Sequence, residues 1–221
     1  NGMDTQNNSR VFYEIFVGSF SDSDGDGTGD LRGIINRMDY LNDGDPASGK
    51  SLGIEGIWLT PVFLSPTYHK YDVTDYYRID PVFGTEEDLR ELAALCHERD
   101  VKLILDLPLN HTGDQCRWFK NFSNAHQMRN PGNAYYDFYT WISPDEPVPA
   151  GRHFTRLPSG LALYESNFSD SMPELHFDHE SVRQALLDVA EYWLGLGIDG
   201  FRFDAAKYPY YGEHDKNAEF W

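Results

Sequence analysis

An arginine and an aspartate follow an apolar stretch near the end of the 221-residue sequence, in the segment GFRFDAAKY from Gly200 to Tyr208. Side chains two positions apart on a β-strand point to the same face, so we expect Arg202 and Asp204 to lie side by side. Phe201 and Phe203 then point to the other face. Because burying two ions is costly, the pair predicts an aspartate that arginine keeps ionised for chemistry, with a buried structural salt bridge as the alternative.

A loop with acidic residues at alternate positions, SDSDGDGTGD, is the second candidate for chemistry. Oxygen ligands separated by glycines suit a hard cation such as Ca²⁺. The expected ligands are Asp22, Asp24, Asp26, Thr28 and Asp30. The loop begins like an EF-hand but departs from one, since its twelfth position is Gly33 rather than glutamate and a strand is expected before it. The alternative is a solvated acidic turn without a cation.

Strands and helices alternate along most of the chain, as judged from apolar runs and from one-face helical spacing. The predicted strands cover residues 11–17, 56–59, 101–107 and 198–204, and the predicted helices cover residues 31–41, 85–98 and 182–193. Thr85 and Asp88 have the spacing of a capping box, which marks the start of the second helix. Gly195 and Gly197 are candidates for the end of the third helix.

The alternation stops after His111 and returns at about Asp178. The stretch between them is rich in Asn, Pro, Gly and aromatic residues, which is typical of irregular structure. We therefore expect residues 112–178 to form an inserted domain, with residues 1–111 and 179–221 belonging to the main domain.

Alternating strands and helices predict an α/β protein with a parallel sheet, either an eight-stranded barrel or an open doubly wound sheet. The first strand-to-helix turn is rich in aspartate and lacks the glycine fingerprint of dinucleotide-binding sheets, which favours the barrel. Four predicted strands do not close a barrel. The predicted fold is therefore a partial (β/α)8 TIM barrel, about its first four β/α units, with a small domain inserted after strand three.

The composition limits the classes of binding partner that we expect. The sequence has 36 acidic and 18 basic side chains and a net charge of −18, which repels phosphate backbones and anionic lipids, so neither nucleic acid nor a membrane is an expected partner. The start, NGMDTQNNSR, lacks a signal-peptide pattern, although a leader could already have been removed. We expect an extracellular or periplasmic protein, with the cytoplasm as the alternative. Cys96 and Cys116 show no metal spacing and are expected to be free thiols, with one disulfide bridge between them as the alternative.

Several motifs give the sequence its resemblance to the α-amylase family of glycoside hydrolases. DLPLNH, from Asp106 to His111, is similar to the family motif after strand three, and GFRFDAAKY is similar to the motif at strand four. MPELHF, from Met172 to Phe177, and the loop YHKYDVTDYY also resemble family segments. The resemblance implies an eight-stranded catalytic barrel with an extra domain after strand three, and a calcium loop after strand one in which Thr28 contributes its carbonyl.

The resemblance further implies a retaining glycosidase, in which a carboxylate nucleophile and a carboxylic acid stand about 5 Å apart. Asp204 would be the nucleophile, and Arg202 would hold its pKa low and keep it anionic. Lys207 would bind a sugar hydroxyl beyond the cleavage point, with a solvated lysine as the alternative.

The other implied sugar contacts are Tyr71, Asp72 and His111. Tyr71 offers a ring face to a pyranose, with core packing as the alternative role, and Asp72 and His111 can hydrogen-bond sugar hydroxyls. Asp106 and Asn110 are expected to support the site from behind, with Asp106 ordering the neighbouring loop rather than touching sugar.

Ala205, which follows the proposed nucleophile, is similar to relatives that act on α-1,4 links, so α-glucans or maltooligosaccharides are the expected substrates. The implied general acid and a third aspartate follow strands five and seven and lie beyond Trp221. A catalytically inactive, glycosidase-like carbohydrate-binding or scaffold protein is the alternative. An acidic calcium module unrelated to sugar ranks after it.

Overall fold

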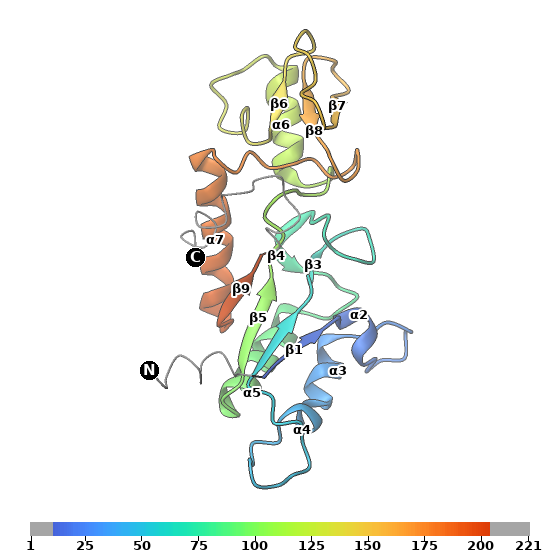
Figure 1. Cartoon of the computed structure of the whole chain (residues 1–221), viewed down its shortest axis with the longest axis vertical. Helices are drawn as coiled ribbons and strands as arrows, with labels where there is room; N and C mark the ends of the chain where they lie inside the picture. Colours follow the sequence, from blue (N-terminus) through green and yellow to red (C-terminus); the bar gives the residue numbers. More distant parts are fainter. Residues whose placement is uncertain (1–10, 204–221) are drawn as a thin grey trace. The chain divides into compact units, whose positions relative to one another are not determined.

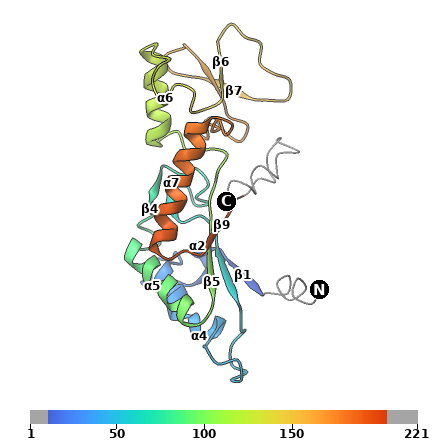
Figure 2. The ribbon, with the colours of Figure 1, turned by 90° about the vertical axis from the view of Figure 1, so that its left-hand side faces the viewer.

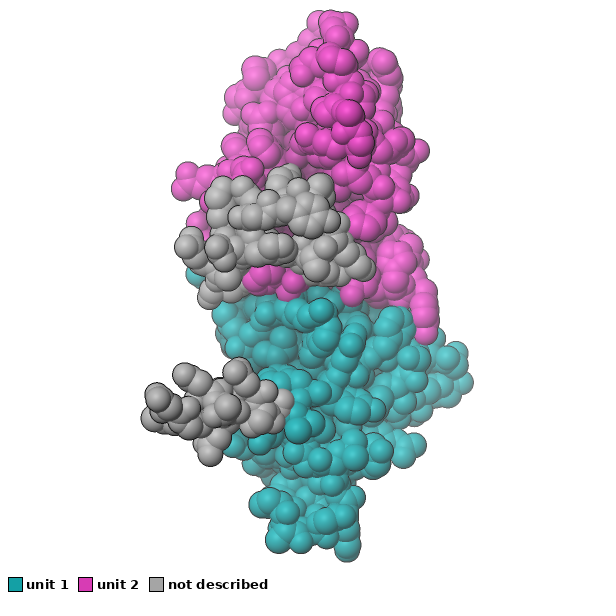
Figure 3. Space-filling model, viewed as in Figure 1, with its two compact units in different colours: residues 1–62, 77–107, 190–202 teal, residues 63–76, 108–189, 203–221 magenta. Residues whose placement is uncertain are grey.

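The computed structural model describes residues 11–203, and the chain divides into two compact units (Figure 3). The first unit comprises residues 1–62, 77–107 and 190–202, and the second comprises residues 63–76, 108–189 and 203–221.

A parallel sheet forms the centre of the first unit (Figure 1). Its four strands, in the order β1-β2-β5-β9, are β1 (Phe12–Ile15), β2 (Gly56–Leu59), β5 (Lys102–Asp106) and β9 (Gly200–Arg202). Leu59 lies opposite Leu105, and Leu105 lies opposite Phe201. The strands are adjacent in the order in which the chain makes them, whereas a doubly wound sheet reverses its order at a switch point. The four predicted parallel strands are confirmed, and their order favours the barrel.

Four helices in the first unit follow the strands: α2 (Val17–Phe20), α3 (Leu31–Asn36), α4 (Met38–Leu41) and α5 (Glu86–Glu98). The predicted first strand was too long, since the chain leaves β1 at Ile15 and turns into α2. The predicted helix over residues 31–41 was also wrong as a single helix. Arg37 interrupts it, and its N–H lies 3.1 Å from the carbonyl oxygens of both Gly33 and Ile34. Met38 and Leu41 stay buried after the break, which is why apolar spacing did not reveal it.

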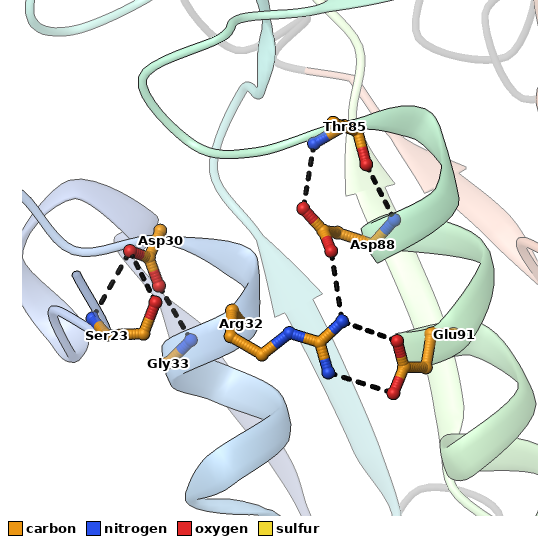
Figure 4. Close-up of polar contacts among 7 residues, drawn as sticks. All are labelled: Ser23, Asp30, Arg32, Gly33, Thr85, Asp88 and Glu91. Carbon is orange, nitrogen blue, oxygen red and sulfur yellow. Dashed lines mark hydrogen bonds and ion pairs between the residues drawn. The ribbon is translucent and has the colours of Figure 1, made fainter.

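The capping box at the start of α5 is confirmed (Figure 4). The Thr85 hydroxyl accepts a hydrogen bond from the Asp88 backbone N–H, and the Asp88 carboxylate accepts one from the Thr85 N–H. The helix buries one face, made by Leu89, Leu92, Ala93 and Cys96. Figure 2 shows α5 on one side of β1 and β5. The helix therefore begins where local sequence directs it and is held by its apolar face.

Helix α7 (Glu180–Leu196) precedes β9. Its predicted apolar stripe is buried, at Val182, Leu186, Val189 and Trp193. Of the two glycines that were candidates for its end, Gly195 lies inside the helix and Gly197 follows it with φ +126°, a conformation that favours glycine.

The second unit contains α6 (Arg117–Gln127) and a three-stranded antiparallel sheet in the order β6-β8-β7. The strands are β6 (Trp141–Ile142), β7 (Phe154–Arg156) and β8 (Leu163–Glu165). Phe119 of α6 meets Tyr139 and Tyr164 edge to face, which forms an aromatic core. The predicted insertion, residues 112–178, thus has secondary structure of its own.

The segment after β2, which contains YHKYDVTDYY, was expected to be a loop. It contains two paired strands, β3 (Phe63–Leu64) and β4 (Asp75–Ile79). Thr74 fixes the pair by donating from both its backbone N–H and its hydroxyl to the carbonyl of Leu64. The segment between these strands carries two of the predicted sugar-binding residues, Tyr71 and Asp72.

Candidate active site

In the first unit, two predicted site residues end neighbouring strands. Asp106 is the last residue of β5, Arg202 is the last residue of β9, and the two lie opposite each other in the parallel ladder. The backbone N–H of Leu107 donates to the carbonyl of Arg202 at 2.7 Å, which fixes this register. Residues opposite each other in a parallel pair share a face, so the structure brings Asp106 and Arg202 together at the carboxyl edge of the sheet. Asp106 is completely buried.

The guanidinium of Arg202 lies over the indole of Trp58, with its central carbon 3.4 Å from the ring centroid. Trp58 is on β2, opposite Ile104, which is opposite Gly200 two residues before Arg202. Its side chain therefore belongs to the same face. Sequence reasoning missed Trp58, because its contact with Arg202 becomes visible only when the strands are set in register.

The expected burial of the arginine was wrong, since Arg202 is exposed. Stacking on Trp58 is a cation–π contact, in which a weakly hydrated guanidinium is held over an aromatic face. Asp204 and Lys207 lie outside the residues that the structure describes.

In the second unit, Asp72 is buried, with 4% of its surface exposed. One of its carboxylate oxygens, Oδ1, accepts hydrogen bonds from the hydroxyls of Ser65, at 2.5 Å, and Thr67. Both bonds orient the carboxylate, and Oδ2 accepts no hydrogen bond within the described part of the chain. A carboxylate held by one oxygen has its other oxygen to offer a ligand hydroxyl.

Tyr71 precedes this carboxylate and is half-buried. Its ring lies 6.0 Å from the ring of His69, and its backbone N–H donates to His69 Nδ1 at 3.0 Å. Lys70, between these residues, has φ +66° and donates from Nζ to the carbonyl of Ser65. The left-handed backbone at Lys70 shapes the turn that carries Tyr71 and Asp72.

His111 is buried in the second unit, and its ring lies 5.2 Å from the ring of Phe168. Its backbone is held from two sides. It pairs with Glu174 in an antiparallel bridge, and the Tyr76 hydroxyl donates to the carbonyl of His111 at 3.4 Å. The neighbouring Asn110 carbonyl accepts from Leu175 N–H at 2.7 Å. The predicted supporting residue Asn110 therefore contributes through its backbone.

The acidic loop brings three of the predicted calcium ligands together. The carboxylate oxygens of Asp22, Asp24 and Asp30 lie within 4.8 Å of one another, and Asp26 is not in this cluster. Instead, Asp26 Oδ1 accepts a hydrogen bond from the Thr28 N–H at 2.8 Å. Gly25 and Gly27 have φ of +78° and +89°, so the loop needs glycine at both positions. Three convergent carboxylates with oxygen as the only donor atom fit a hard cation such as Ca²⁺.

Asp30 joins this cluster to helix α3 (Figure 4). Its Oδ1 accepts from the Gly33 N–H at 2.7 Å and caps the helix, and its Oδ2 accepts from the Ser23 hydroxyl at 2.9 Å. Arg32, in the first turn of α3, forms ion pairs with Asp88 and Glu91 of α5. The acidic loop is thus connected to two helices of the first unit.

The cysteines take no part in these sites. Cys96 and Cys116 are both free and buried, as expected. Burial raises the pKa of Cys96 to about 12 and raises that of Cys116, which disfavours their thiolates.

Comparisons with known proteins agree on one family. The family model "Alpha amylase, catalytic domain" matches residues 14–219. Alpha-amylase 3 of Dictyoglomus thermophilum is 43% identical over 213 residues, which cover 96% of this chain and 39% of that protein. The oligo-1,6-glucosidase of Bacillus cereus is 40% identical over 208 residues, 90% of this chain and 35% of that protein. The crystal structure of an α-amylase from H. orenii matches with a TM-score of 0.80 at 44% identity, covering 96% of this chain and 43% of that one.

The chain therefore spans less than half the length of these proteins. Within residues 11–203, no helix combines the length and apolar character needed to cross a bilayer.

Proposed function

Because the chain belongs to the α-amylase family of glycoside hydrolases, we propose that it is part of a retaining enzyme that cleaves α-1,4-linked glucans or maltooligosaccharides. The observation that carries the proposal is the register of Asp106 and Arg202, which presents a charged pair at the carboxyl edge of a parallel sheet. In barrel enzymes this edge is where catalytic groups gather.

The proposed nucleophile is Asp204, which follows Arg202 by two residues in the sequence, the spacing at which side chains of a β-strand share a face. A guanidinium near a carboxylate favours its ionised form, so the proposed role of Arg202 is to keep the nucleophile charged when substrate displaces water. Arg202 stacks on Trp58 of β2 and lies opposite Asp106 of β5 in the ladder. Retaining cleavage also needs a carboxylic acid, which we assign to a part of the protein outside this chain.

Substrate recognition is assigned to the second unit and to Lys207. Asp72 Oδ2 accepts a sugar hydroxyl, the Tyr71 ring packs on the CH face of a pyranose, and the His111 imidazole bonds another hydroxyl. Lys207 donates to a hydroxyl beyond the cleaved bond. The orientation of Asp72 by Ser65 and Thr67 supports this assignment.

The preference for α-1,4 links rests on Ala205 and on relatives named α-amylase. Other relatives are named oligo-1,6-glucosidase and trehalose-6-phosphate hydrolase, so the choice of linkage requires a direct assay. We propose that the protein acts outside the cytoplasm and binds neither nucleic acid nor membranes, in keeping with its net charge of −18.

The function is tested by comparing Asp204→Asn with Asp145→Asn in the complete enzyme, on maltotriose and isomaltotriose. Asp145 is an exposed aspartate in the second unit and serves as the matched control. We expect the parent and the control to hydrolyse maltotriose faster than isomaltotriose. NMR should show that the product keeps the α configuration. Asp204→Asn should lose activity by about 10⁴-fold or more, as expected when a covalent nucleophile is removed. Inverted product, or an active Asp204→Asn enzyme, would contradict the proposal.

We further propose that the acidic loop binds Ca²⁺ through Asp22, Asp24 and Asp30, with Asp26 and the Thr28 carbonyl joining the ligand set. A bound cation would supply structural stability rather than chemistry, because one of its ligands, Asp30, caps helix α3.

The calcium site predicts a stability effect. Removing the ion with a chelator should lower Tm by a few degrees, and added Ca²⁺ should restore it, because a ligand that binds only the folded state stabilises that state. An Asp22→Asn variant should melt at the lower temperature and respond weakly to either treatment. A parent protein whose melt ignores both the chelator and Ca²⁺ would rule out the site.

A further inference from the structure

Two glutamates, Glu165 and Glu174, are buried close together in the second unit. Glu165 ends β8 and is 3% exposed, and Glu174 lies in the segment that pairs with His111 and is 6% exposed. Their backbones are joined by a hydrogen bond of 2.9 Å from the Glu174 N–H to the Glu165 carbonyl. The proposed sugar chemistry uses neither carboxyl group.

One arginine and one amide serve both carboxyl groups. Arg152 binds Glu165 through two hydrogen bonds of 2.6 and 2.7 Å, a bidentate pair. The Asn167 side-chain amide donates to Glu165 at 3.0 Å and to Glu174 at 2.9 Å. Glu174 therefore shares a buried site with Glu165, whose carboxylate pairs with Arg152.

This arrangement disfavours a charge on Glu174. Burial raises the pKa of Glu174 to about 7, with the nearby Glu165 acting in the same direction, while Arg152 and the Asn167 amide act against it. As the pH rises, Glu174 in the folded state therefore keeps its proton to a higher pH than in the unfolded chain, where its pKa has the ordinary value of 4.5. The contribution of protonated Glu174 to the stability of the folded state is therefore complete below pH 4.5 and is lost as the pH rises through about 7.

Glu174 is joined to the sugar-binding motif through its backbone. The segment 173–175 lies antiparallel to 110–112, with His111 opposite Glu174. Leu175 N–H donates to the Asn110 carbonyl at 2.7 Å, and Thr112 N–H donates to the Pro173 carbonyl at 3.1 Å. A displacement of Glu174 therefore acts on the segment 173–175, which is paired with the backbone of His111.

We propose that Glu174 is a positioning residue for His111, which it holds in place when its carboxyl group is protonated and releases as the pH rises past neutrality. The proposal deepens the function above and rests on it for the role of His111 in sugar binding. Weaker sugar binding at alkaline pH follows, because ionised Glu174 repels Glu165 and loosens the segment 173–175.

The experiment uses the complete enzyme and compares the parent with Glu174→Gln, which mimics the protonated carboxyl group. Backbone hydrogen exchange of the peptides that cover 110–112 and 173–175 is measured from about pH 5.5 to about pH 8.5, corrected for intrinsic exchange, together with KM for maltotriose. We expect protection in the parent to fall by about tenfold across this range and KM to rise by a similar factor, with kcat changing less. In Glu174→Gln both should stay level.

Two further variants sharpen the result. Glu146→Gln changes an exposed glutamate in the same unit and should behave like the parent. Asn167→Ala removes a hydrogen bond that favours the ionised form of Glu174, so the fall in protection should move to higher pH. This variant keeps the proposal testable if Glu174→Gln does not fold.

Protection in the parent that is independent of pH would overturn the proposal, as would a pH-dependent fall that persists unchanged in Glu174→Gln. If the complete protein hydrolyses no maltotriose, the proposed function fails, and the exchange data still decide whether Glu174 holds the backbone of His111.

Discussion

The polar residues of the two units are held in different ways. In the first unit, Asp106 and Arg202 take their places from a backbone ladder, because each is the last residue of a strand and the strands are in fixed register. In the second unit, Asp72 is oriented by the hydroxyls of Ser65 and Thr67, and the backbone of His111 is paired with the irregular segment 173–175.

This difference indicates how each set responds to substitution. A residue placed by a sheet keeps its position when one side chain nearby is changed, so loss of function there reports on chemistry. A residue placed by a few polar side chains moves when one of them is lost, so loss there reports on binding geometry.

Among the residues that the sheet of the first unit places, Asp106 and Arg202, the largest expected effect comes from Arg202→Lys. Lysine keeps the charge but lacks the planar guanidinium that stacks on Trp58, so we expect kcat on maltotriose to fall by about 100-fold or more. Steady-state kinetics of the complete enzyme measure it, with Arg117→Lys, at an exposed arginine of α6, as the matched control. Activity close to that of the parent would show that the orientation of Arg202 does not matter.

A smaller effect is expected from Asp72→Asn, at a residue of the second unit that polar side chains hold in place. An amide can still accept from Ser65 and Thr67 but loses the charge offered to the sugar, so KM should rise by about 10- to 100-fold while kcat changes less. Ser65→Ala, which removes one orienting bond, should raise KM by a smaller factor in the same assay. If Ser65→Ala raises KM by as much as Asp72→Asn does, the Asp72 carboxylate acts by ordering the loop rather than by binding the sugar.

The smallest effect is predicted for Trp58, the residue that stacks on Arg202. Trp58→Leu removes a cation–π contact and should lower kcat by about 2- to 30-fold, with KM nearly unchanged. Trp58→Phe keeps an aromatic face and should restore part of the loss. A change confined to KM, or no recovery with phenylalanine, would separate Trp58 from the positioning of Arg202.

The regular elements of the first unit followed from sequence because their causes are local. The strand at Gly56–Leu59 and the capping box of α5 were predicted from a short apolar run and from two polar residues three apart. The break at Arg37 was not, since buried residues continue on both sides of it. Apolar spacing reports which face is buried, and it is insensitive to one residue that leaves the helix.

The site was predictable only where a motif carries it. Arg202 was found from its place at the end of a predicted strand and Asp106 from the motif DLPLNH, whereas Trp58 needed the register of β2, β5 and β9. The clustering of Glu165 with Glu174 depends on a hydrogen bond between residues nine apart in an irregular segment, and no periodic pattern indicates it. The loop aspartates were predicted because they occupy alternate positions in the sequence. In the structure, however, Asp26 accepts a hydrogen bond from the backbone N–H of Thr28 and does not join Asp22, Asp24 and Asp30.

Covalent trapping tests the central claim most directly. The complete enzyme is incubated with a fluorinated α-glucosyl fluoride, digested, and analysed by mass spectrometry for the glycosylated peptide. We predict a single adduct on Asp204 in the parent and none in Asp204→Asn. A stable adduct on another carboxylate of a catalytically active enzyme would contradict the assignment of Asp204 as the nucleophile that Arg202 keeps charged.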